Sequence, residues 1–197
     1  MVARRPQGER ADAMRARIVE AALAAIREQP VANVQLAAIA ERAGLRPGHV
    51  LYYFASRDAV LVETVRVAEG RLADVRTAAL ARVSAPLERL DVYVEYYLPD
   101  DRHDPVWKLW LAAWLRSPAH ADFAALGTAM DARWRADLVA ALGDAVAAGA
   151  QLDDDLDAVA TRMHVWLDGL ALHVMSDHIA PAEAVAMARA QLRRELA

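Results

Sequence analysis

The chain has 197 residues, of which 56% are hydrophobic and 25% are charged, and its formal net charge is −4 at pH 7. This composition excludes disordered and fibrous proteins, and no apolar run approaches the roughly 18 residues that span a membrane. The absence of cysteine excludes disulfides, thiolate nucleophiles and cysteine-ligated metal sites. The basic N-terminus has no apolar stretch behind it that would indicate a secretory signal, so we expect a cytoplasmic protein without a membrane partner.

The predicted secondary structure is helical along the whole chain. The sequence contains no alternating Val/Ile/Thr run and no Asn-Gly or Asp-Gly hairpin turn, whereas apolar residues recur at helical spacing. Proline, glycine and small capping residues mark the expected ends of the helices. The nine predicted helices cover about 9–29, 36–43, 47–53, 57–83, 86–98, 105–116, 119–149, 154–177 and 181–196.

Residues 36–61, LAAIAERAGLRPGHVLYYFASRDAVL, form the most informative segment. A helix with an apolar face, a turn containing Gly44 and a short second helix predict helix-turn-helix geometry, in which the second helix enters the major groove of DNA. The first 57 residues carry nine arginines against five acidic residues, a local charge of +4, and the remainder has 14 basic and 22 acidic residues. Only the N-terminal end is therefore expected to meet a polyanion.

Few side chains of the short second helix can reach the bases. Arg46 could bind guanine at the start of this helix, and Gly48 permits close approach of the backbone. Tyr52 or Tyr53 and the following arginine are placed to contact phosphates, which fix register without reading sequence. The expected DNA-contacting residues are Gln35, Arg46, Pro47, Gly48, His49, Tyr52, Tyr53 and Arg57.

The segment resembles the N-terminal domain of TetR-family transcriptional repressors over about residues 10–62. It shares with them IAxxAG, a glycine in the recognition turn, YYF and the following Ser-Arg-Asp-x-x-Leu. Pro47-Gly48 and the sequence WLDGLALHVM at 166–175 are similar to the BetI-like branch, whose best-known member responds to choline. The resemblance implies a homodimer that binds a palindromic operator and a C-terminal domain that binds a small organic effector.

Three positions depart from the family pattern. Arg46 stands where the family usually has a serine that caps the recognition helix. Leu51 occupies a position where tyrosine is frequent, which removes one expected phosphate contact, and His49 replaces a small polar or aliphatic residue. The resemblance therefore predicts DNA binding without predicting an operator sequence.

The resemblance and the helix pattern together predict an all-α protein with an N-terminal three-helix head and a C-terminal helical bundle. The expected divisions are a flexible basic arm at 1–8, a DNA-binding domain at 9–56, and a ligand-binding and dimerisation domain at 57–197. We expect a ligand-responsive transcriptional repressor that has no catalytic residues and no cofactor. The effector, of unknown identity, is expected to release the DNA.

Three tryptophans on one helical stripe suggest a ligand site. Trp107, Trp110 and Trp114 follow i, i+3, i+7 spacing, a pattern that usually marks a packed core. Side chains of this size also suit the wall of a cavity, and aromatic faces attract quaternary ammonium ions. The expected ligand-binding residues are Tyr96, His103, Trp107, Trp110, Trp114, Met130, Trp134, Met163, Trp166 and His173.

The last two helices are the expected dimer interface. The helix at about 154–177 is apolar nearly all round, more than one domain core can cover, and the last helix carries an apolar stripe. Two such helices from each copy would form a four-helix bundle. The expected interface residues are Leu156, Val159, Leu167, Leu170, Val174, Val185 and Leu192.

Two other classes of function find less support in the sequence. The six histidines include no His-Glu-x-x-His and no i, i+4 pair, so no metal site is expected. The alternative to a repressor is an all-α small-molecule-binding protein or an enzyme without DNA-binding activity. No nucleophile, carboxylate–histidine or phosphate-binding motif supports that alternative.

Overall fold

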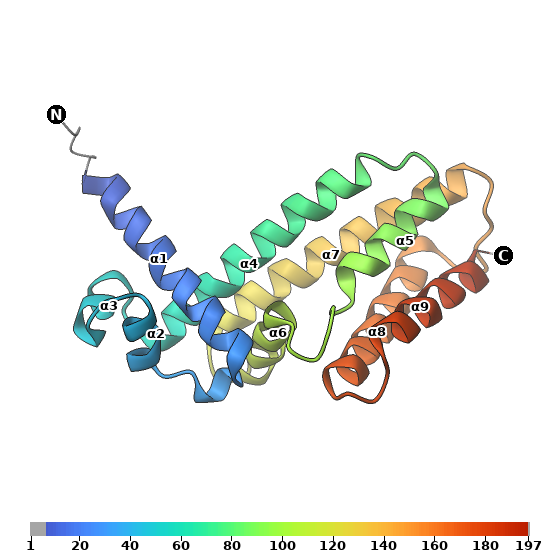
Figure 1. The fold of residues 1–197 in the computed structure, drawn as a ribbon. Helices are drawn as coiled ribbons and strands as arrows, with labels where there is room; N and C mark the ends of the chain where they lie inside the picture. The colour runs from blue at the N-terminus through green and yellow to red at the C-terminus, as the bar shows by residue number, and fades with distance from the viewer. Residues whose placement is uncertain (1–6, 197) are drawn as a thin grey trace. The chain divides into compact units, whose positions relative to one another are not determined.

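The structure, a computed structural model, describes residues 7–196 and consists of helices joined by short connections (Figure 1). The all-α prediction is confirmed, and the predicted helix ends agree with the observed ones to within a few residues. The predicted basic arm lies outside the described residues, apart from its last two positions. The described elements are α1 (Gln7–Glu28), the 3-10 helix η1 (Val31–Asn33), α2 (Leu36–Arg42), α3 (Pro47–Tyr53), α4 (Arg57–Leu80), α5 (Pro86–Tyr97), α6 (Pro105–Arg116), α7 (Ala121–Ala147), α8 (Leu156–Met175) and α9 (Pro181–Glu195).

The chain divides into two compact units. The head unit comprises Met1–Ala68 and Pro105–Gly127, and the body unit comprises Glu69–Asp104 and Thr128–Ala197. This division differs from the predicted boundary at residue 57, because α6 and parts of α4 and α7 belong with the N-terminal helices. One reason is local: Lys108 of α6 donates hydrogen bonds at 3.0 Å to two carbonyls in the last turn of α1.

The head unit is held together by aliphatic side chains at helical spacing. Ile18 and Ile26 of α1, Ile39 of α2 and Val50 of α3 are all fully buried. Gly44, in the turn between α2 and α3, has a φ of +62°, a conformation that glycine adopts without strain. A Cβ at this position would lie 2.5 Å from a guanidinium nitrogen of Arg17, which is the end of a flexible side chain that can move aside, so the backbone conformation is what requires glycine here.

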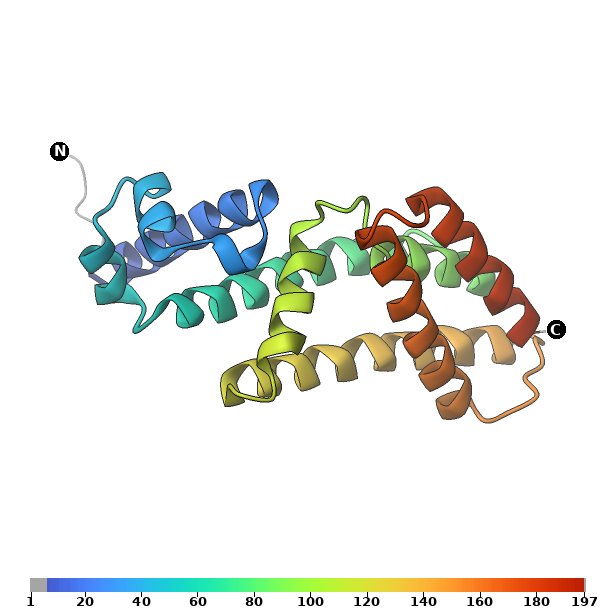
Figure 2. The same ribbon diagram turned by 90° about the horizontal axis from the view of Figure 1, so that it is seen from below.

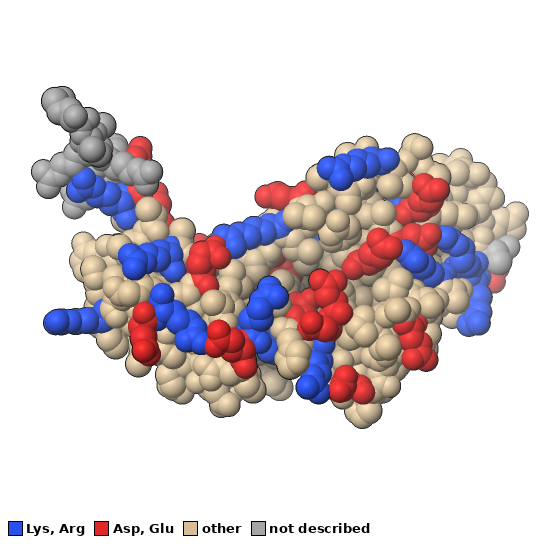
Figure 3. Space-filling model, viewed as in Figure 1, with Lys and Arg blue, Asp and Glu red and all other residues tan. Residues whose placement is uncertain are grey.

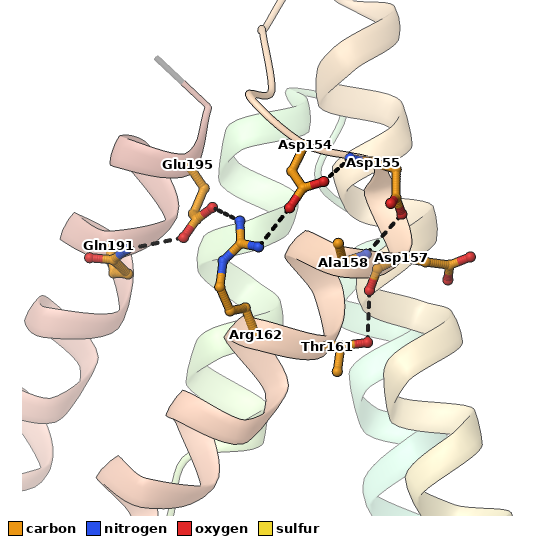
Figure 4. A network of polar contacts seen from close by, with 8 residues as sticks. All are labelled: Asp154, Asp155, Asp157, Ala158, Thr161, Arg162, Gln191 and Glu195. Atoms are coloured by element: carbon orange, nitrogen blue, oxygen red, sulfur yellow. Dashed lines mark hydrogen bonds and ion pairs between the residues drawn. The ribbon is translucent and has the colours of Figure 1, made fainter.

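Within the body unit, α8 and α9 lie side by side in both views (Figures 1 and 2). The Asp155 side chain caps α8 by accepting a hydrogen bond at 2.9 Å from the backbone N–H of Ala158. Arg162 donates to Asp154 at 3.0 Å and to Glu195 at 2.7 Å, and so joins α8 to α9 (Figure 4). The hydrogen bond from Arg162 lowers the pKa of Glu195. The acidic run before α8 therefore caps that helix and helps to join it to α9.

None of the helices within residues 7–196 is long and apolar enough to cross a membrane.

Candidate DNA-binding and effector sites

The start of α3 presents a set of side chains to solvent. Arg46, Pro47, Gly48 and His49 are exposed, whereas Val50 is fully buried and anchors the helix to the head. Arg46 has extended backbone geometry at the N-cap position, and its side chain makes no cap hydrogen bond. Pro47 opens the helix at a position where its missing N–H costs nothing. A Cβ on Gly48 would meet open space, so packing inside the head does not require glycine there.

The aromatic end of α3 is divided between surface and core. Tyr52 is 76% exposed, Tyr53 is half-buried, and Phe54 is only 5% exposed. The rings of Tyr52 and Tyr53 meet edge to face with centroids 5.0 Å apart, and the His49 ring lies 5.5 Å from Tyr53. The three rings form one aromatic surface along α3. The hydroxyl groups of its two tyrosines are suited to phosphate contacts.

Arg57 has a different role from the predicted phosphate contact. Its Nε donates to the carbonyl of Val34 at 2.5 Å, and another guanidinium nitrogen donates to the carbonyl of Val31. A third contact, at 3.3 Å, is an ion pair with Asp58. Burial lowers the pKa of Arg57, and the nearby Arg116 adds to that effect. The guanidinium thus binds carbonyls between α1 and α2 and joins that segment to α4, so we do not carry Arg57 forward as a phosphate contact.

Other polar residues of the head remain available to a polyanion. Gln35 is exposed at the N-cap of α2, where its side chain makes no cap hydrogen bond. On the face that Figure 3 draws, basic side chains are spread over the head unit with acidic ones between them.

The predicted ligand-binding residues do not all belong to one unit. Trp107, Trp110 and Trp114 of α6 belong to the head unit, where Trp114 meets the other two rings edge to face at 6.1 and 5.6 Å. The other predicted residues belong to the body unit. Among these, the side chains of Met130, Trp134 and Met163 are buried, those of Tyr96 and Trp166 are half-buried, and those of His103 and His173 are exposed.

The body unit contains an aromatic–carboxylate cluster that sequence reasoning largely missed. It consists of Tyr93 and Tyr97 of α5, Asp131 and Trp134 of α7, and His164 and Asp168 of α8. The two tyrosine rings stack at 5.7 Å, and the Trp134 ring meets them edge to face at 5.6 and 5.0 Å. The i, i+4 spacing of Tyr93 with Tyr97, and of His164 with Asp168, is the sequence signal that points to shared helix faces.

The polar groups of the cluster are arranged around Tyr97. Its hydroxyl donates a hydrogen bond to Asp168, and the His164 ring meets its ring edge to face at 5.4 Å. Burial raises the pKa of Tyr97, so the phenol keeps its proton and acts as a donor. Burial also raises the pKa of Asp168, and the hydrogen bond from Tyr97 opposes that shift. A half-buried carboxylate next to aromatic faces is an environment that a cation would stabilise.

Trp134 connects the cluster to further charged groups. Its indole N–H donates to Glu69 at 3.2 Å, and the buried guanidinium of Arg76 stacks 3.6 Å from its ring centroid. Arg76 is itself paired with Asp137. Carboxylates therefore outnumber fixed positive charges around these rings, which favours a cationic ligand over an anionic one.

The structure places most of the predicted dimer-interface residues inside the body unit of the single chain. Five of them are no more than 4% exposed, because they pack inside the body unit and hold α8 and α9 in place: Val159, Leu167, Leu170, Val174 and Leu192. Leu156 and Val185 are half-buried. The apolar side chains that these helices expose are Val165 (66%) and Leu172 (43%) of α8 and Met187 (40%) of α9. We call these three residues the exposed apolar face.

Comparisons with known proteins identify the class to which this fold and these sites belong. Residues 86–197 match the family model described as BetI-type transcriptional repressor, C-terminal, and residues 18–64 match bacterial regulatory proteins, tetR family. The chain belongs to the TetR family of transcriptional regulators and, within it, to the BetI type. It is a ligand-responsive, DNA-binding regulator and not an enzyme, as the sequence predicted.

Individual relatives agree with this assignment. The HTH-type transcriptional regulator BetI of Rhizobium meliloti is 28% identical over 154 residues, which cover 78% of this chain and 73% of the relative. BetI of Burkholderia thailandensis is 34% identical over 105 residues, covering 52% of this chain and 54% of the relative. The crystal structure of a transcriptional regulator from Saccharomonospora viridis in complex with choline has a TM-score of 0.81 and 27% identity, covering 91% of this chain and 93% of that one.

Proposed function

We propose that two copies of this chain bind a palindromic operator, and that an organic cation of the quaternary ammonium class binds the body unit and releases the DNA. The aromatic–carboxylate cluster is the observation that carries the choice of effector class. The choline bound to the Saccharomonospora viridis regulator supports the same class. Because operator DNA lies in the cytoplasm, the regulator acts there.

The reading surface of each copy is the exposed start of α3. The proposed DNA contacts are Gln35, Arg46, Pro47, Gly48, His49, Tyr52 and Tyr53, without Arg57. One short helix reaches few bases, so affinity requires two copies whose α3 helices lie about 34–36 Å apart, one turn of DNA. Arg46 is the residue best suited to guanine, and the tyrosine hydroxyls fix the register through phosphates.

The second copy docks on the exposed apolar face. Val165 and Leu172 are seven residues apart on α8 and therefore share one side of the helix. Gly169 lies between them, and a Cβ there would meet nothing within 4 Å, so a partner helix can approach closely. Met187 on the neighbouring α9 extends the same kind of surface. Permanent interfaces between copies bury apolar surface of this kind.

Effector and operator binding are coupled through helices that both units share. The boundaries between head and body fall inside α4 and α7, so each of these helices contributes residues to both units. A change in the body unit on effector binding therefore has a covalent path to the head. A coupling of roughly 1–3 kcal/mol is typical of such systems, and it acts equally in both directions.

Choline is the probe that tests the effector class. We expect calorimetry of the full chain to show saturable binding of choline, and Asp168→Asn to weaken that binding about tenfold, because the half-buried negative charge is lost while the shape is kept. Asp177→Asn makes the same chemical change at an exposed carboxylate of the body unit and should leave the affinity unchanged. Absence of choline binding, or equal loss in both variants, would contradict the proposal.

A further inference from the structure

Leu51 adds an apolar group to the surface of α3 that faces DNA, beside the polar and aromatic contacts proposed above. We infer that Leu51 packs against the C5-methyl group of a thymine in each half-site of the operator, and so selects thymine at that position. This inference rests on the proposed function, because it concerns the helix that enters the major groove. It names one base that the operator must contain.

Leu51 lies on the side of α3 that faces away from the interior of the head unit. Its side chain is 46% exposed, whereas the preceding residue, Val50, is fully buried and anchors the helix. Residues three and four positions apart are neighbours on a helix, so Leu51 adjoins Gly48 and Pro47, which are both exposed. Leu51 therefore belongs to the same surface as the proposed base contacts.

Gly48 leaves the space that brings Leu51 to the bases. A Cβ at Gly48 would meet nothing within 4 Å in this chain, so the surface beside Leu51 is bare. Glycine permits close approach of the backbone to a ligand. Because no side chain at position 48 holds the helix away from the floor of the groove, the neighbouring side chain of Leu51 comes into contact with base edges.

A leucine side chain can recognise only one feature of the major groove. It has no hydrogen-bond donor or acceptor, so it cannot pair with the ring nitrogens, carbonyls and amino groups that the bases present there. Covering one of these polar groups would remove its water without replacing the hydrogen bond, which weakens binding. The C5-methyl group of thymine is the apolar group on the edges of the four unmodified bases, and its burial against leucine strengthens binding. Leu51 therefore favours thymine over the other three bases.

Exchange of thymine for uracil tests the inference, because the two bases differ only in the C5-methyl group and both pair with adenine. The DNA upstream of the protein's own gene is prepared without methylated cytosine, once with thymine and once with uracil, and gel-shift titrations give the affinity of the full chain for each. Loss of one methyl contact lowers affinity about fourfold, so the loss in two half-sites should weaken binding roughly tenfold. Affinity for a scrambled duplex should be the same with either base, because it depends on phosphates.

The two ways of failing can be told apart in this experiment. Equal affinities for thymine and uracil DNA, with specific binding retained, would overturn the inference and leave operator binding standing. Absence of specific binding to the thymine DNA would overturn both.

Two leucine variants locate the methyl contact. Leu51→Ala shortens a surface side chain and should reduce the preference for thymine DNA to about twofold or less. Leu115→Ala makes the same change on α6 of the head unit, at a leucine that is 84% exposed, and should keep the full preference. An undiminished preference in Leu51→Ala would assign the sensitivity to another side chain or to the shape of the DNA, and would overturn the inference. If Leu51→Ala fails to fold, the comparison of the two DNAs with the unaltered protein still tests the methyl contact.

Discussion

Replacing Val165 by arginine is expected to convert the proposed dimer into a monomer and to lower operator affinity about 100-fold or more. Val165 is 66% exposed in the single chain, so the substitution leaves the interior of the body unit unchanged. In a two-fold symmetric interface, each copy would bring one arginine into the apolar contact, so the change acts twice. Burying unpaired charges there opposes association strongly. Monomers bind half-sites only, and the gain from linking two half-sites is lost.

Sedimentation equilibrium at micromolar concentration and a gel-shift titration measure the two effects together. Val75→Arg is the matched control, because Val75 of α4 is 54% exposed in the body unit and lies outside the exposed apolar face. The control should stay dimeric and keep its operator affinity. A Val165→Arg protein that remains dimeric would place the interface elsewhere. An unaltered chain that sediments as a monomer of 21.5 kDa would show that there is no dimer interface.

Arg46→Ala is expected to reduce the preference for the operator over unrelated DNA by about 100-fold. A bidentate contact to guanine contributes roughly 1–3 kcal/mol of discrimination, and the residue occurs in both half-sites of a dimeric complex. Operator affinity should therefore fall much more than affinity for unrelated DNA. His49→Ala should act in the same direction.

Fluorescence anisotropy with operator and scrambled duplexes at fixed salt measures this ratio. Arg66→Ala is the control, since it removes one positive charge from an exposed arginine of the same head unit. It should lower both affinities slightly and leave their ratio unchanged. An Arg46→Ala protein that loses affinity equally for both duplexes would show that Arg46 contacts phosphate and does not read a base.

The helices and the reading head could be predicted because their signals are local. Proline at the first turn of α3, α5, α6 and α9 fixes where those helices begin, and Gly44 marks the end of α2. The helix-turn-helix segment lies within 26 consecutive residues, 36–61, so its spacing alone defines the geometry. Apolar periodicity also identified the shared face of the three α6 tryptophans.

The contacts that the sequence did not indicate have a common cause: periodicity identifies the apolar face of a helix but not the residues that pack against it. The apolar surface of α8 suggested an interface between copies, yet the body unit covers Leu167 and Leu170 with its own side chains. Arg57 looked available for a phosphate, but its partners are carbonyls 23 and 26 residues away. The hydrogen bond from Tyr97 to Asp168 spans 71 residues, so no local pattern could reveal that part of the cluster.

We expect this protein to bind operator DNA and to lose that binding in the presence of an organic cation. The test is a titration of labelled DNA, taken from the region upstream of the protein's own gene, with the full chain. The titration is done once in choline chloride and once in sodium chloride at the same concentration. The matched salt is needed because operator affinity depends on ionic strength. We expect specific binding in sodium chloride and a saturable loss of affinity in choline, with operator DNA weakening choline binding by the same factor. An operator affinity that is the same in choline chloride as in sodium chloride would contradict this expectation. So would the absence of specific DNA binding.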